Sequence, residues 1–223
     1  MLALVAVVGL GPSLPARARA DLGDKSVVSL GVDRLFGFSN THVNLSAPFQ
    51  ASGSRTEFAL LMNSSSSAYT TPRLAADVGV ADHVTVGGAV GIIIAGVSGT
   101  STSGGVSNDT GSNGTGVILA PRVGYVLGLG TGGTRLWLRG GFSYFQTSSK
   151  EDRTMFETST RGFALDLEPT FVFMLAPHVG VTVSAVLDLP LTGEIKGSAG
   201  GTSQGVDMTI RCLGILAGLT LPL

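Results

Sequence analysis

Residues 134–147, with the sequence TRLWLRGGFSYFQT, decide the fold of this chain. Apolar residues alternate with charged or small ones along them: Leu136 and Leu138 share one face, whereas Arg135 and Arg139 fall on the other. Strict alternation is typical of a β-strand, because successive side chains of a strand point to opposite sides of the sheet. The stretch therefore predicts a strand with one apolar face and one face that holds charges and glycines.

The same alternation recurs along most of the chain, in runs separated by clusters of Gly, Ser, Asn and Asp. Helical periodicity competes with it nowhere, so the pattern predicts an all-β fold. A further apolar patch, Phe58 to Met62, would make the number of strands odd, and we place it in a loop as a cap or short extension. The eight predicted strands are 26–38, 71–80, 83–95, 116–128, 134–147, 161–174, 179–191 and 206–221.

The connections between these strands alternate strictly between long and short. A meander with this pattern has all its long loops at one end and both termini with the tight turns, as bacterial outer-membrane barrels do. A soluble eight-stranded barrel shares part of the pattern, so the faces must decide between the two. The predicted long loops are 39–70, 96–115, 148–160 and 192–205, and the predicted short turns are 81–82, 129–133 and 175–178.

Two features favour a membrane barrel: the composition of the chain, and the small residues on the second face of each strand. Of the 223 residues, 43% are hydrophobic and only 13% are charged, with 33 glycines and a mean hydropathy of +0.40. The polar face is too rich in glycine for a water-exposed exterior, but it suits the narrow lumen of a small barrel. The barrel must close, because unpaired backbone groups at a sheet edge in hydrocarbon cost several kcal/mol each. No apolar run reaches the length of a transmembrane helix, and a net charge of −1 without a basic cluster excludes nucleic acid as the partner.

The charged residues of the small-residue face predict ion pairs inside the barrel. If the short turns set the registers, Arg122, Arg139, Glu168 and Asp188 lie at similar heights on consecutive strands. The alternative, separately solvated charges in a water-filled channel, stays open. The proposed lumenal ion-pair belt comprises Arg122, Arg135, Arg139, Asp166, Glu168 and Asp188.

A few positions break the alternation. The strand at 26–38 slips in phase after Val32, and Arg211 falls in phase with apolar residues, so either a bulge shifts the strand or Arg211 lies near the rim. Three prolines inside strands, each of which removes a ladder donor, predict local bulges or strand ends. They are Pro121, Pro169 and Pro190.

The N-terminus has the pattern of an export signal. Leu2 to Leu10 is an apolar stretch, and Ala18-Arg19-Ala20 is a small-x-small cleavage site before Asp21. We expect residues 1–20 to be a signal peptide cleaved after Ala20, and residues 21–223 to form one barrel domain; a buried first helix is the alternative. Cys212 is the sole cysteine, so one chain can form no internal disulfide.

Motifs for catalysis or cofactor binding are sparse, and we expect neither a cofactor nor a metal. Residues 128–133 match G-x-G-x-x-G, but a strand follows them where a dinucleotide site needs a helix. His83 and His178 lie in short turns without a spaced second ligand. His42, near Ser39 and Ser46, is the only histidine on the long-loop side and hence the one candidate base for a lipid hydrolase or acyltransferase.

Taken together, the chain resembles the small eight-stranded outer-membrane β-barrel proteins of Gram-negative bacteria. The resemblance covers residues 21–223 and rests on the architecture and on stretches such as 29–33 and 213–223, although the chain ends in Leu223 where such proteins usually have an aromatic residue. It implies a closed antiparallel up-and-down transmembrane β-barrel in the outer membrane, a monomer in contact with membrane lipid and lipopolysaccharide. Fold does not settle function.

Three functions remain in view. The first is a non-catalytic structural or surface-interaction protein that acts through its four long loops. The second is an outer-membrane lipid-modifying enzyme, an acyl hydrolase or transferase, that uses His42. The third is a soluble exported barrel that binds a small apolar ligand, against which the charged lumen argues.

Overall fold

The structure, a computed structural model, describes residues 21–46, 50–60, 68–103, 106–129, 133–151, 157–199 and 202–223. The predicted signal peptide, residues 1–20, lies outside these ranges. In the described part of the chain, no helix has the length and hydropathy needed to cross a membrane. The elements are β1 (Val28–Leu45), β2 (Ser52–Leu60), the 3-10 helix η1 (Ala68–Thr70), β3 (Arg73–Ala81), β4 (Val84–Ser103), β5 (Val106–Gly128), β6 (Thr134–Glu151), β7 (Glu157–Ala176), β8 (Val179–Ala199) and β9 (Thr202–Pro222).

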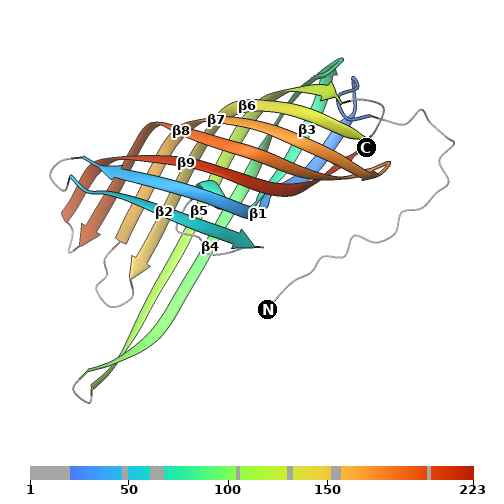
Figure 1. Cartoon of the computed structure of the whole chain (residues 1–223). Coiled ribbons are helices and arrows are strands. Elements are labelled where there is room, and N and C mark those ends of the chain that lie inside the picture. Colours follow the sequence, from blue (N-terminus) through green and yellow to red (C-terminus); the bar gives the residue numbers. More distant parts are fainter. Residues whose placement is uncertain are drawn as a thin grey trace.

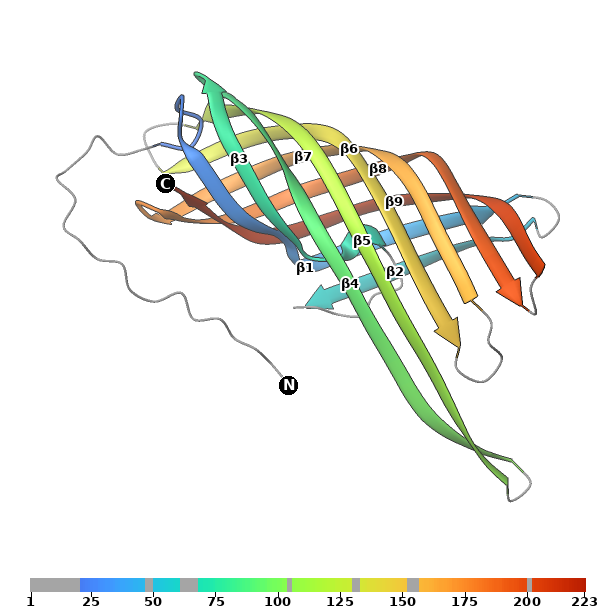
Figure 2. The same ribbon diagram turned by 180° about the vertical axis from the view of Figure 1, so that it is seen from behind.

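Eight antiparallel strands close into a ring, which confirms the predicted fold class (Figures 1 and 2). Neighbours in the ring follow chain order from β3 to β9, and β1 joins its two ends by pairing with both β3 and β9. The seam between β1 and β9 runs from Ser29↔Pro222 to Leu45↔Met208. Over residues 29–32, where β1 pairs with both β3 and β9, the described strands therefore leave no free sheet edge.

The ninth strand, β2, corrects the prediction for the first long loop. Residues 58–60, expected to cap the loop, belong to a strand that pairs with β1 from Asn44↔Ser52 to Phe36↔Leu60; residues 61 and 62 lie outside the described ranges. β1 thus changes partner along its length, because its residues 28–33 pair with β3 and its residues 36–44 pair with β2. The rings of Phe38 and Phe58, 4.7 Å apart, pack β2 against β1 on the outer face.

The other predicted long loops are also largely strand. Pairing between β4 and β5 continues from Val84↔Tyr125 out to Ser103↔Val106, and this hairpin projects far beyond the rest of the barrel (Figure 2). Residues 148–151, 157–160, 192–199 and 202–205 likewise extend β6 to β9. The Gly, Ser and Thr content of these segments removes the apolar alternation, but an antiparallel ladder needs only backbone hydrogen bonds, so the hairpins continue without it.

A bulge in β1 explains the phase slip in the sequence. The register with β9 shifts between Val32 and Phe36, and Arg34 has a left-handed φ of 59°. The bulge turns two consecutive side chains, Asp33 and Arg34, into the barrel, where both are buried. An extra residue of this kind re-aims a side chain at a defined place in a strand.

The remaining irregularities are resolved as follows. Pro190 lies beside a register shift between β7 and β8, as predicted, whereas Pro121 and Pro169 lie inside strands without a shift next to them. The seam is regular around Arg211, so its side chain faces outward, while Cys212 is buried. Arg211 pairs in register with His42, beyond the last outward apolar residues of β9.

An apolar band encircles the outer face of the barrel. Its side chains, including Leu74, Ile92, Phe142 and Leu213, are among the most exposed large hydrophobics of the chain. On the long-hairpin side the band ends at aromatic residues, Phe38 and Phe58 on one side and the contacting pair Tyr144 and Phe163 on another. The next outward residues beyond this edge are polar: Asn40, Gln146, Arg161 and Arg211.

Candidate functional site

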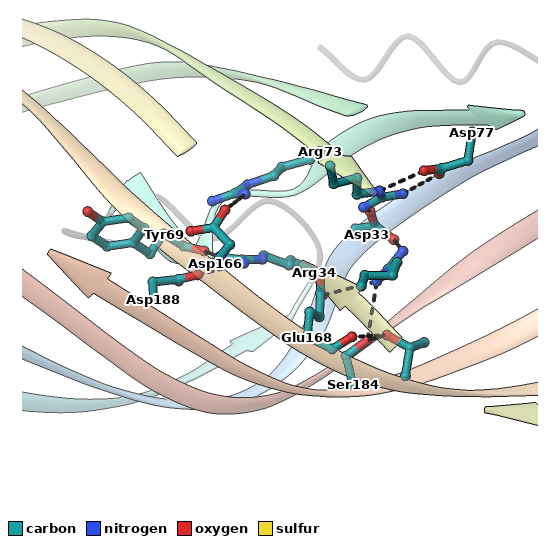
Figure 3. A network of polar contacts seen from close by, with 12 residues as sticks. Asp33, Arg34, Tyr69, Arg73, Asp77, Asp166, Glu168, Ser184 and Asp188 are labelled. Carbon is teal, nitrogen blue, oxygen red and sulfur yellow. Dashed lines mark hydrogen bonds and ion pairs between the residues drawn. The ribbon is translucent and has the colours of Figure 1, made fainter. Parts of the chain in front are cut away.

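The centre of the lumen holds a belt of buried charges from six strands. β1 contributes Asp33 and Arg34 through its bulge, and the other strands contribute one or two charges each from their small-residue face. Figure 3 shows these side chains pointing toward one another across the interior. The belt comprises Asp33, Arg34, Arg73, Asp77, Arg122, Arg139, Asp166, Glu168 and Asp188, each with less than about a tenth of its side chain exposed.

One half of the belt is built around Asp33. Its two carboxylate oxygens accept hydrogen bonds from Arg122 at 2.5 Å and from Arg139 at 3.1 Å. Arg122 also donates two hydrogen bonds to Asp77, at 2.9 and 2.5 Å. Arg139 continues to Glu168 at 3.1 Å. The chain of pairs thus crosses the lumen from β3 to β7.

The other half is built around Arg34. Its guanidinium donates two hydrogen bonds to Asp188, both at 2.9 Å, and a third to the backbone carbonyl of Tyr69 at 2.5 Å. Asp166, the cross-strand neighbour of Asp188, pairs with Arg73 at 3.6 Å and accepts a hydrogen bond from Ser143 at 2.9 Å. Bidentate pairing of arginine with a carboxylate is a strong form of side-chain hydrogen bond, so Arg34 ties the η1 segment to β1 and β8, while Asp166 links β7 to β3 and β6.

Five of the six predicted belt residues lie in this network: Arg122, Arg139, Asp166, Glu168 and Asp188. Arg135 does not. It forms an ion pair with Asp21, and its register with Gly128 puts it at the short-turn end. Arg135 and Arg139 are four residues apart on the same face, so alternation alone predicts the same side for both but does not separate their heights.

Four belt residues were missed by sequence reasoning. Arg73 and Asp77 fall on the small-residue face of their strand, which was a usable signal, although their height was not predicted. Asp33 and Arg34 were hidden by the bulge, because two adjacent charges cannot face the same side of a regular strand.

Apolar clusters lie on both sides of the belt. Toward the hairpins, Tyr69 packs edge-on against Phe145 at 5.3 Å, in a cluster with Ile118, Met208 and Cys212. Toward the short turns, Trp137 packs with Leu22, Val126 and Val172. Trp137 also lies under the Arg139 guanidinium at 4.9 Å and donates a hydrogen bond to Thr85 at 3.0 Å. The lumen is therefore packed above and below the charges.

A small cavity lies within the belt. A cavity of about 10 Å³ is lined by Arg73, Arg122, Arg139, Asp166 and neighbouring backbone. A volume of this size holds about one water molecule. Among the described residues, Nε and Nη2 of Arg73 and Nε of Arg139 have no hydrogen-bond partner, which are the donors that such a water would satisfy.

At the outer rim, the structure gives His42 a neighbour that the sequence did not suggest. His42 Nδ1 and Ser54 Oγ are hydrogen-bonded at 2.7 Å across the β1–β2 ladder. Of the two serines considered beside it, Ser39 is buried on the opposite face. Ser54 was missed because β2 was taken as a loop. His178 bonds to the Pro222 carbonyl at 3.0 Å, and His83 lies in a turn with a φ of 68°.

The site offers no place for a metal within the described ranges, where no three His, Cys, Asp or Glu side chains gather suitably. What the arrangement does chemically is to fill and neutralise the interior of a narrow barrel.

A closed ring of eight antiparallel strands with an apolar outer band and charges inside is the fold of the small outer-membrane β-barrel proteins. The solved structures similar to this chain have that fold. The outer membrane protein OprG from Pseudomonas aeruginosa is 12% identical, with a TM-score of 0.52 over 91% of this chain and 99% of OprG. Neisserial surface protein A is 10% identical, with a TM-score of 0.47 over 89% of this chain and 100% of that one. No protein-family model and no curated protein matches the chain.

Proposed function

We propose that this chain is an integral outer-membrane protein without an axial channel, which anchors long hairpins at the cell surface for contacts with other molecules and has no catalytic role. The observation that carries the proposal is the lumenal belt. Ion pairs from six strands cross the interior, and the cavity lined by Arg73, Arg122 and Arg139 holds about one water. A diffusion pore needs many more strands to leave an aqueous passage.

The two ends of the barrel differ in a way that supports an orientation. Outer-membrane barrels have short periplasmic turns and longer extracellular segments, and here the long hairpins all project from one end (Figure 1). We infer that the β4–β5 hairpin faces the outside, that the apolar band contacts membrane lipid and that the polar edge above it contacts lipopolysaccharide. A monomer exported by a signal peptide cleaved after Ala20 fits this arrangement.

Conductance tests the absence of a channel. The protein is refolded into planar lipid bilayers, and current is recorded at both polarities. We expect no stepwise conductance, because buried ion pairs cross the interior. The double variant Arg122→Ala/Arg139→Ala, which deletes two of the crossing side chains, is the comparison and should show at least intermittent steps. Steady conductance of the unmodified protein would contradict the proposal.

Surface labelling tests the orientation. In a Cys212→Ser background, a cysteine replaces Ser203, an exposed residue at the hairpin end of β9, or Asp82, an exposed residue of the β3–β4 turn. A membrane-impermeant maleimide added to intact cells should label the first variant and spare the second. The reverse labelling pattern would show that the short turns, rather than the long hairpins, face the outside.

One observation favours a second candidate, hydrolysis of a lipid acyl ester. The hydrogen-bonded pair of Ser54 and His42 lies on the outward face, just beyond the apolar band, where an ester of a membrane lipid would lie. In this reaction Ser54 Oγ attacks the ester carbonyl while His42 takes its proton. The lipid alcohol then leaves with that proton, and water cleaves the acyl-serine to release a fatty acid. Among the described residues, no side chain bonds to the other ring nitrogen to orient the imidazole.

Fatty-acid release from phospholipid in mixed micelles tests this candidate. Ser54→Ala and His42→Ala should each abolish release, whereas Asn40→Ala and Thr56→Ala, which remove a neighbouring bonded pair on the same two strands, should retain it. Absence of release by the wild type, or release that survives His42→Ala, removes the enzyme from consideration.

A further inference from the structure

One edge of β4 has no partner strand over its outer half. β3 pairs with β4 only as far as Leu74↔Val90, and in the described part of the chain no other strand pairs with that side of residues 91–103. The opposite edge of β4 is paired throughout, because its ladder with β5 runs from Val84↔Tyr125 to Ser103↔Val106 without a register shift. The outer half of β4 is therefore a regular strand with one free row of backbone N–H and C=O groups.

The last part of this free edge lies where another molecule can reach it. The β5–β6 ladder begins at Ser112↔Glu151, level with Val97, so residues 98–103 project beyond the ring (Figure 2). At about 3.4 Å per residue, this segment spans about 20 Å. A free edge of this length is a template for pairing with a further strand.

The edge of β4 also lacks the features by which proteins protect exposed edges. Charged side chains, proline and bulges are the usual protection. β4 contains no Asp, Glu, Lys, Arg or Pro, and its ladder with β5 has no bulge. In contrast, β2, which ends the sheet, contains the ion pair of Arg55 and Glu57, and the outer segment of β5, residues 106–111, contains Asp109. Of these three strands, β4 is the one whose edge is open to pairing.

The strand that fits this edge is the same segment of a second copy. Two identical edges pair antiparallel about a twofold axis, and each copy then uses the same residues. A self-pair of β4 brings no like charges together, whereas a self-pair of β5 would bring Asp109 near its symmetry mate, which is unfavourable.

The direction of the strands decides where the second copy must lie. Copies in one membrane have the same orientation, so their β4 edges are parallel, and the slanted hydrogen bonds of a parallel pair do not allow a twofold axis between identical strands. Copies in two facing membranes have opposite orientations, so their β4 edges are antiparallel. Because the hairpin projects beyond the rest of the barrel, its outer end is the part that meets a copy in a facing membrane (Figure 2).

We propose that this protein mediates contact between cells that carry it, with the β4 edge at residues 98–103 paired antiparallel to the same edge of a copy in the facing outer membrane. Each copy stays a monomer in its own membrane. Many copies on one cell surface act together, and such multivalent contact is far stronger than a single pair. This inference rests on the proposed function, which puts the hairpins outside the cell, and it names their partner.

Aggregation of mixed cells tests the contact. Two populations of cells that produce the full chain, each with its own fluorescent label, are mixed, and two-colour aggregates are counted by flow cytometry. We expect at least fivefold more aggregates than for cells without the protein. Replacement of residues 98–111 by an Asn-Gly turn should abolish this excess. Cells that produce the protein should not aggregate with cells that lack it.

Two charge variants distinguish self-pairing from other contacts of the hairpin. Thr100→Lys or Thr100→Glu alone should lower aggregation at least fivefold, because like charges then meet across the pair. A mixture of Thr100→Lys cells with Thr100→Glu cells should restore aggregation. The matched control makes the same two changes at Ser203, an exposed residue at the hairpin end of β9, and should leave aggregation unchanged.

Three results would each overturn the proposal: aggregation that survives the loss of residues 98–111, aggregation with cells that lack the protein, and failure of the mixture of opposite charges to aggregate. Surface labelling of the Ser203→Cys variant reports the orientation separately. Cells that are labelled but do not aggregate would remove the contact between copies and leave the proposed function in place, whereas the reverse labelling pattern would remove both.

Discussion

Arg34 shows how one residue can combine backbone irregularity with a structural role. Its φ of 59° is in the left-handed region, which is uncommon for a residue other than glycine. In return, the guanidinium reaches Asp188 and the Tyr69 carbonyl deep in the lumen. Positions of this kind persist where the surroundings over-determine them, and here the surroundings are two strands and the η1 segment.

Removal of Asp188 should therefore be strongly destabilising. Asp188→Ala leaves the Arg34 guanidinium buried without its carboxylate, and such a loss costs about 3–5 kcal/mol. The measurement is urea unfolding of the detergent-refolded protein, followed by tryptophan fluorescence of Trp137. Glu157→Ala, which removes a carboxylate from a pair with exposed Lys150, should change the free energy of unfolding by less than about 1 kcal/mol.

A double variant distinguishes the contribution of the Arg34–Asp188 pair to stability from the contributions of its two members. Arg34→Leu/Asp188→Leu removes both charges together, so no unpaired ion stays in the lumen, and the variant should be more stable than Asp188→Ala. The contrary result is a loss of unfolding free energy in the double variant that equals the sum of the losses in the two single variants. In that case the hydrogen bond to Tyr69 and the bulge, rather than charge pairing, hold this part of the barrel.

At the scale of elements, β2 depends on β1 for its place. It is held by the ladder to β1, by the side-chain hydrogen bonds Asn40–Thr56 and His42–Ser54, and by the contact between Phe38 and Phe58 at 4.7 Å. Phe58→Ala should loosen β2 alone, with amide exchange over residues 52–60 accelerated about fivefold or more, since aromatic pairs contribute about 0.5–1.5 kcal/mol beyond their buried area. Phe163→Ala, which removes the ring contact with Tyr144, should leave exchange in β2 unchanged; faster exchange there in both variants would point to a general loss of order.

In contrast, we expect the outer part of the β4–β5 hairpin to contribute little to the stability of the barrel. Beyond Val97↔Ser112, β4 and β5 pair only with each other, because the β5–β6 ladder begins at Ser112. Replacement of residues 98–111 by an Asn-Gly turn, which closes two-residue hairpins well, should leave the unfolding midpoint in urea within error of the wild type. A large fall in stability would mean that this extension supports the barrel and is more than a display element.

What the sequence predicts well is the part of each strand that lies in the apolar band. There one face contacts an apolar surrounding and the other the lumen, so alternation is enforced, as in 161–174 and 179–191. Beyond Phe163 and Leu191 both faces are mostly polar, with Ile195 as an inward exception, so the alternation there is too weak to mark a strand. The site was predictable to the same degree: Arg139 and Glu168 follow from alternation, whereas Asp33, Arg34 and Ser54 depend on a bulge and on a ninth strand.

At the scale of the whole molecule, the fold rests on the closure of β1 against β9. Backbone ladders that close on themselves resist detergent, so unboiled protein should migrate differently from boiled protein in a detergent gel.

The variant Ile215→Pro tests the seam, because it introduces a residue that cannot donate a ladder hydrogen bond, in the middle of the seam opposite Phe38. We expect the temperature at which the folded band disappears to fall by ten degrees or more. Gly111→Pro, the same change in the β4–β5 extension, should leave that temperature unchanged, because no ring strand other than β4 pairs with that residue. Equal temperatures for Ile215→Pro and the wild type would show that the seam does not limit unfolding, and the belt of ion pairs would then be the element that holds the barrel closed.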